Sequence, residues 1–174
     1  MGGGIHNKNA VLKQHPGEIE RILAKYPANF RKSAVMPLLY LAQRELGYLT
    51  KKQIKDVAEI TGLSTTDVDS VAGFYSLFHE KPGGRYHVQV CTDLPCALRG
   101  AEEFLAQLCE NIGVKLGETT PDGMVTVEAV TCLAGCHHAP MFQVQSGSDI
   151  AYYEDQTVES AIKVVAGLRQ EAVK

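Results

Sequence analysis

The chain has 174 residues, of which 45% are hydrophobic and 21% are charged, and its formal net charge is −3. That length accommodates one ordinary domain or two small ones, and the composition is that of a soluble globular protein. The mildly acidic charge argues against a nucleic-acid-binding protein, which usually carries a basic patch. No run approaches about 18 consecutive apolar residues, so the sequence predicts no direct insertion into a membrane.

The start of the chain does not resemble a targeting signal, since Met1–His6 has no apolar core and no arginine. We expect residues 1–15 to form a flexible tail. The expected location is the cytoplasm, or the mitochondrial matrix if the sequence is a processed form.

Residues 16–82 have the periodicity of helices and predict a small four-helix bundle. The second of these helices is expected to start near Pro37 and to end at Gly47. Thr50 and Ser64 each have the residue pattern of a helix N-cap. Helical spacing also predicts core packing for the aromatic residues of the last helix: Phe74, Tyr75 and Phe78.

Lys81–Gly84 interrupts the helical pattern and marks the expected domain boundary. From residue 83 to residue 174 the pattern changes to short strands and helices in the order β-α-β-β-β-α, which predicts a small sheet with helices packed on it. The whole chain is therefore expected to be α+β. Strands are expected at 86–90, 124–130, 141–144 and 150–153, and helices at 98–112 and 157–168.

Four of the five cysteines form two pairs, Cys91 with Cys96 and Cys132 with Cys136. An odd number of cysteines without a secretory signal argues against a disulfide framework. Each pair follows a predicted strand, and ligands gather at the carboxyl ends of strands in open sheets, so the fold can bring the pairs together. A [2Fe–2S] cluster takes two thiolates on each iron, but structural zinc also takes four, so the spacing leaves both metals open.

Three further residues near the cysteine pairs have simpler interpretations. Cys109 lies on the apolar stripe of its helix, where a free cysteine behaves as a small hydrophobic core residue. His137 and His138 follow Cys136 directly, and one of them could bond a sulfur or replace a cysteine ligand. Because four cysteines already suffice for a cluster, we interpret both histidines as polar loop residues.

The cysteine motifs resemble those of a known family. Cys91-Thr-Asp-Leu-Pro-Cys96 and Cys132-Leu-Ala-Gly-Cys136-His-His-Ala-Pro140 are similar to the cluster motifs of the 24 kDa iron–sulfur subunit of NADH:quinone oxidoreductase, respiratory complex I. The turn at residues 117–123 and the helical stretch 38–81 match as well. The resemblance covers about residues 16–172, which is nearly the whole chain.

The resemblance implies a helical bundle followed by a thioredoxin-like ferredoxin domain over residues 83–174. It implies that Cys91, Cys96, Cys132 and Cys136 hold one [2Fe–2S] cluster. The implied partners are the flavin- and NADH-binding subunit, which holds the FMN near the cluster and binds the NADH, and the other peripheral-arm subunits of the complex. Through that complex the chain would be peripheral to the inner membrane. The chain would then be an electron-carrying subunit of an oxidoreductase, with no complete active site of its own.

Other interpretations of the same residues remain open. NAD-linked hydrogenases and formate dehydrogenases use similar subunits, so the resemblance leaves the host complex undecided. A structural zinc module that only assembles partners is the alternative from a different functional class. The sequence also departs from the family after Pro140, where a longer loop is expected over residues 145–149 in place of a short acidic turn. That departure concerns the contacts of the loop and leaves the expected ligands unchanged.

Overall fold

A computed structural model describes residues 14–147 and 149–171 of the chain. The chain divides into two compact units, Met1–Pro82 and Gly83–Lys174. The tail expected at residues 1–15 falls outside the described residues except for Gln14 and His15. Among the described residues, no helix is long and apolar enough to cross a membrane.

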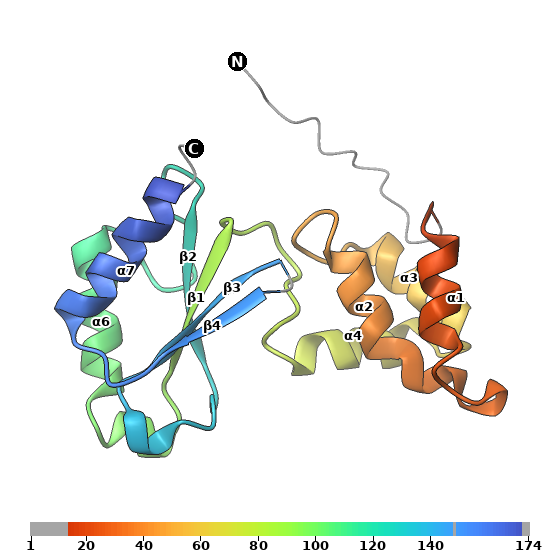
Figure 1. Cartoon of the computed structure of the whole chain (residues 1–174), viewed down its shortest axis with the longest axis horizontal. Helices are drawn as coiled ribbons and strands as arrows, with labels where there is room; N and C mark the ends of the chain where they lie inside the picture. Colours follow the sequence, from red (N-terminus) through yellow and green to blue (C-terminus); the bar gives the residue numbers. More distant parts are fainter. Residues whose placement is uncertain (1–13, 148, 172–174) are drawn as a thin grey trace. The chain divides into compact units, whose positions relative to one another are not determined.

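The N-terminal unit is helical (Figure 1). Its helices are built around one apolar core. Leu38 and Val57 are fully buried in that core. The two expected N-caps are confirmed, since Thr50 and Ser64 each form a capping box with the third residue of the helix that follows. The helices are α1 Pro16–Leu23, the 3₁₀ helix η2 Ala28–Ala34, α2 Val35–Gln43, α3 Lys51–Thr61 and α4 Thr65–Phe74.

The second α-helix begins earlier than its proline suggested. α2 starts at Val35, and Pro37 lies in its first turn. The backbone N–H groups of a first helical turn have no partner within the helix, so a proline there removes no intrahelical hydrogen bond. The chain can therefore enter the helix before the proline.

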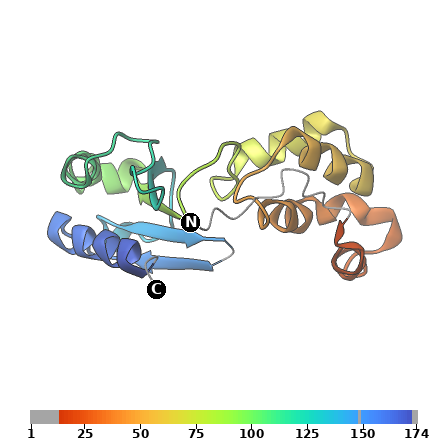
Figure 2. The ribbon, with the colours of Figure 1, turned by 90° about the horizontal axis from the view of Figure 1, so that it is seen from above.

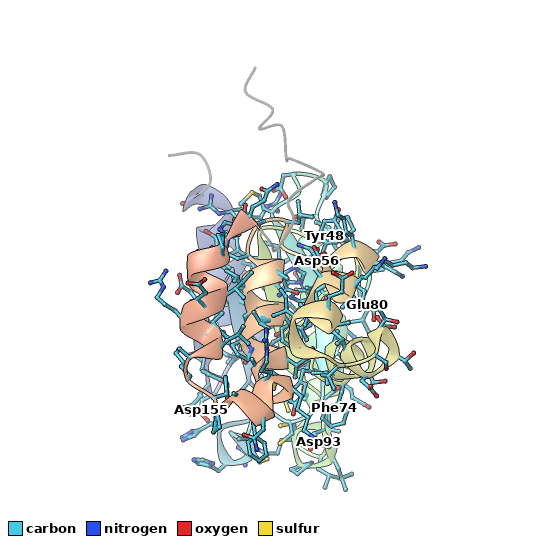
Figure 3. The ribbon with its side chains drawn as sticks, turned by 90° about the vertical axis from the view of Figure 1, so that its right-hand side faces the viewer. Tyr48, Asp56, Phe74, Glu80, Asp93 and Asp155 are labelled. Atoms are coloured by element: carbon cyan, nitrogen blue, oxygen red, sulfur yellow. The ribbon has the colours of Figure 1, made fainter. Side chains whose placement is uncertain are left out.

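The aromatic residues at the end of α4 do not all pack inward, contrary to the expectation from their spacing. Phe78 is buried, and its ring centroid lies 4.7 Å from that of Tyr40. Phe74, labelled in Figure 3, is 80% exposed and Tyr75 is 41% exposed. The reason is that α4 ends at Phe74 and the backbone of Tyr75 is extended, so the helical spacing does not continue through the three rings.

A bidentate ion pair joins α1 to the end of α2 and makes the stability of the N-terminal unit depend on pH. Arg44 donates from Nη1 and Nη2 to the two carboxylate oxygens of Glu18, at 2.9 and 2.8 Å. The hydrogen bonds from Arg44 lower the pKa of Glu18 below its ordinary value of 4.5. A lowered carboxyl pKa stabilises the folded state above the unfolded pKa, and this contribution disappears as the pH falls through the folded pKa.

We therefore expect Arg44→Met to destabilise the N-terminal unit modestly at pH 7, and we expect the difference from the wild-type chain to shrink below about pH 4. Urea unfolding at a series of pH values measures both quantities. In a Glu18→Gln background, the loss of unfolding free energy caused by Arg44→Met should not change with pH. A difference that persists unchanged in that background would show that the ion pair is not its cause.

Within the described residues, the C-terminal unit contains a four-stranded sheet in the order β2-β1-β3-β4 (Figure 1). β1 and β2 are parallel neighbours, whereas β3 is antiparallel to both β1 and β4. All four expected strands are present, with ends that differ by one or two residues. They are β1 Tyr86–Cys91, β2 Val125–Val130, β3 Phe142–Ser146 and β4 Asp149–Tyr153.

Two long helices, α6 Ala101–Ile112 and α7 Val158–Glu171, lie side by side on one face of this sheet (Figures 1 and 2). Leu108 of α6 and Val165 of α7 are buried in the same core as Val88 and Val90 of β1. Because side chains alternate along a strand, the polar Gln89 and the last residue, Cys91, belong to the opposite face.

Two segments of this unit differ from the expectation. The helix expected over residues 98–112 is α6, which begins three residues later, at Ala101, because Gly100 before it takes a left-handed backbone conformation with φ of 85°. A separate short helix, α5 Leu94–Ala97, precedes it. The longer loop expected over residues 145–149 is instead the end of a β-hairpin. Ser146 pairs with Asp149 there, and Gly147 has a φ of 61°. A positive φ at glycine has little steric cost, which suits a tight hairpin.

Candidate functional site

The parallel pairing of β1 and β2 brings the two cysteine-bearing loops to the same edge of the sheet. Cys91, the last residue of β1, stands opposite Val130, the last residue of β2. The backbone N–H of Thr92 donates to the carbonyl of Val130 at 3.1 Å, so the loops that follow β1 and β2 start side by side. Cys132 follows two residues after β2. This edge lies at the lower end of the sheet in Figure 1.

The first loop buries both of its cysteines. Asp93 caps α5 by accepting a hydrogen bond from the backbone N–H of Leu94 at 2.9 Å, and Pro95 occupies the first turn. Cys96 therefore lies inside a short, capped helical turn, where it is fully buried, and Cys91 is 1% exposed. A proline early in a helix and a capping aspartate are both local signals that the sequence carries, and they hold Cys96 in place.

The second loop has a constrained backbone. Cys132 and Ala134 have φ values of 49° and 62°, in the left-handed region that costs a residue with a side chain about 1–2 kcal/mol. Cys136 opens the 3₁₀ helix η3 Cys136–His138. A Cβ atom on Gly135 would overlap the sulfur and terminal methyl of the buried Met141, so a larger residue there would require the end of that side chain to shift.

Three of the four paired cysteines lie close enough to influence one another. Cys91 and Cys96 share a small buried cluster with Ala139 and Met141. Burial, followed by the hydrogen bond with Cys91 and the charges of Cys91, Cys136 and Asp93, raises the pKa of Cys96 to about 12. Cys132 is exposed and Cys136 is half-buried. At neutral pH the Cys96 thiol therefore ionises only when a nearby cation, such as a bound metal ion, compensates its charge.

His138 is held by acidic residues that follow β4. Its Nδ1 lies 2.7 Å from Oδ2 of Asp155, labelled in Figure 3, and its Nε2 lies 3.9 Å from a carboxylate oxygen of Glu154. The ring of His137 lies 4.1 Å from that of His138, centroid to centroid. The engagement of His138 with Asp155 agrees with the interpretation of these histidines as polar loop residues. Sequence reasoning missed Asp155, because its contact with the cysteine loop depends on the β4–α7 connection.

Cys109 lies away from this site, in the core between α6, α7 and the sheet. It is 8% exposed, and burial raises its pKa. The prediction that Cys109 is a core residue is confirmed.

Comparison with known proteins gives the chain its family. The family model described as thioredoxin-like [2Fe-2S] ferredoxin matches residues 19–169. NADH-quinone oxidoreductase subunit 2 of Thermus thermophilus is 43% identical over 151 residues, which are 87% of this chain and 82% of that protein. Another NADH-quinone oxidoreductase subunit, from Rhizobium meliloti, is 45% identical over 127 residues, covering 73% of this chain and 74% of that one.

Among solved structures, an NAD+-reducing [NiFe]-hydrogenase in the air-oxidized state matches with a TM-score of 0.60 and 16% identity, over 77% of this chain and 23% of the hydrogenase chain. At that identity the match shows a shared fold and nothing more. The two relatives are named as subunits of the complex that the cysteine motifs suggested, so the predicted resemblance is confirmed. The chain belongs to the thioredoxin-like [2Fe–2S] ferredoxin family.

Proposed function

We propose that this chain is the [2Fe–2S] electron-carrier subunit of an NADH:quinone oxidoreductase. The observation that carries the proposal is the meeting of two cysteine-bearing loops at one edge of the sheet, in a chain of this family. Relatives that are 43% and 45% identical bear the name of that complex. In this proposal Cys91 and Cys96 bind one iron, and Cys132 and Cys136 bind the other.

The residues at this edge of the sheet suit that chemistry. When bound, the cluster supplies reversible one-electron transfer between donor and acceptor groups. Burial of Cys91 and Cys96 keeps water from one side of the site, while the exposed Cys132 leaves another side accessible to a redox partner.

The proposal extends to partners and location. The partner is the flavin- and NADH-binding subunit, where FMN and NADH bind. This chain is associated with the membrane peripherally, through the complex to which it belongs. The N-terminal unit, residues 16–82, is proposed to act as a four-helix bundle, which its single shared core supports. The C-terminal unit, residues 83–174, is proposed as the cluster-binding domain.

Affinity purification of the tagged full-length chain from its own cells tests the proposal. We expect it to bring down a flavoprotein that contains FMN and oxidises NADH. Freezing the purified complex within milliseconds of adding NADH should give a spin-half EPR signal of a reduced [2Fe–2S] cluster. Co-purification with a nickel-containing hydrogenase or a formate-oxidising enzyme instead would overturn the assignment of the host, and a complex whose cluster NADH cannot reduce would overturn the role.

A further inference from the structure

In the segment that follows Cys136, four successive backbone carbonyls, those of residues 138–141, accept hydrogen bonds. Each of these four carbonyl oxygens accepts a hydrogen bond from a different residue outside the segment. The pairs are Asp155 N–H to His138 at 2.8 Å, Arg99 Nε–H to Ala139 at 3.1 Å, Gln156 N–H to Pro140 at 2.8 Å and Cys91 N–H to Met141 at 3.2 Å.

Arg99 supplies the one side-chain donor among these four bonds. The other three donors are backbone groups, which would remain whatever side chains those residues carried. Arg99 also lies three residues after Cys96, and its own backbone N–H donates to the carbonyl of Cys96 at 3.0 Å. This residue thus contacts the first cysteine loop through its backbone and the second through its guanidinium group.

We propose that Arg99 is a positioning residue, which fixes the separation of the two cysteine-bearing loops so that all four thiolates face one cluster. The inference rests on the ligand set of the proposed function. A guanidinium group is planar and permanently charged, so the hydrogen bond from Nε has a fixed direction and remains at every pH of interest. Its positive charge next to an anionic cluster also favours the more negative, reduced state.

Three variants of the full-length chain separate the effect of geometry from that of charge. Arg99→Met removes both the donor and the charge, and Arg99→Lys keeps the charge without the planar group. Arg85→Met is the control, because it makes the same change in charge at an arginine that lies against the ring of Tyr86. Tyr86 begins β1 and Cys91 ends it, so about 17 Å of strand separate the control from the site.

The measurements are the rate of cluster loss to an iron chelator, followed by visible absorbance, and the EPR spectrum of the reduced protein. We expect Arg99→Met to lose its cluster about tenfold faster than the wild-type chain and to shift or broaden the EPR lines, because the ligand loops no longer keep one separation. The rate of cluster loss from Arg99→Lys should lie between the rates of Arg99→Met and of the wild-type chain. Arg85→Met should match the wild-type chain in both measurements.

Wild-type loss rates and EPR lines in Arg99→Met would overturn the inference, as would equal losses in Arg99→Met and Arg85→Met, which would show an effect of net charge alone. A wild-type chain that takes up no cluster under reconstitution would overturn the proposed function and this inference with it. Cluster uptake by the wild-type chain, with no difference in Arg99→Met, would overturn the inference and leave the proposed function standing.

Discussion

Replacing Cys96 with alanine is expected to leave the purified chain with a small fraction of the wild-type iron and sulfide. Cys96 is fully buried in the turn of α5, next to Cys91 and within electrostatic reach of Cys136. Alanine carries no sulfur at this position, so one iron would lack a protein ligand. Iron and sulfide analysis after anaerobic reconstitution measures the loss directly.

Cys109→Ala is the matched control for this experiment. It removes another buried thiol, from the core between the helices and the sheet, where the lost sulfur should cost about 1–2 kcal/mol of unfolding free energy. The cluster content should stay at the wild-type level. Equal loss of iron from both variants would contradict the proposed ligand set, because it would mean that cluster loss follows general destabilisation.

The second large effect is expected at Gly84, just before β1. A Cβ atom there would lie 2.8 Å from the backbone carbon and oxygen of Met124 and from the backbone nitrogen of Val125. These atoms belong to the start of β2, and the N–H of Tyr86 donates to the carbonyl of Met124 at 2.8 Å. Since the backbone cannot move away without weakening the β1–β2 pairing, Gly84→Ala should destabilise the C-terminal unit by about 3 kcal/mol.

Hydrogen exchange of peptides from β1 and β2 checks this prediction in the full-length chain, because it reports the stability of each unit separately. Gly167→Ala in α7 is the control within the same unit. No atom lies within 4 Å of a Cβ added there, and alanine in an exposed helix should increase stability by up to about 1 kcal/mol. Exchange in β1 and β2 that is the same for Gly84→Ala and the wild-type chain would show that the strands tolerate the added methyl group.

The sequence predicted those parts of the fold that local patterns determine. Alternation of apolar residues located the strands, and the capping boxes at Thr50 and Ser64 located two helix starts. Where the prediction failed, a backbone angle changed the pattern. The left-handed Gly100 divides α5 from α6, and the extended Tyr75 ends the helical register of the aromatic residues. Local sequence patterns do not predict the order of the strands in the sheet, because that order depends on which faces become buried.

The candidate site shows the same limit. The motifs located both cysteine pairs along the chain, and the parallel pairing of β1 and β2 explains why they share one edge. The supporting contacts come from residues without a recognisable motif. Arg99 reaches Ala139 across 40 positions of the sequence, and Asp155 reaches His138 across 17. Such contacts exist only once the sheet has formed, so residue spacing cannot reveal them.

The most direct test of the cluster is the metal content of the wild-type chain. The full-length protein, purified without oxygen, would be analysed for iron, acid-labile sulfide and zinc, and its EPR spectrum recorded after reduction with dithionite. We predict about two irons and two sulfides per chain and a rhombic or near-axial spin-half signal. About one zinc per chain, with no iron and no signal even after reconstitution with iron and sulfide, would contradict the proposed cluster and support a structural zinc module.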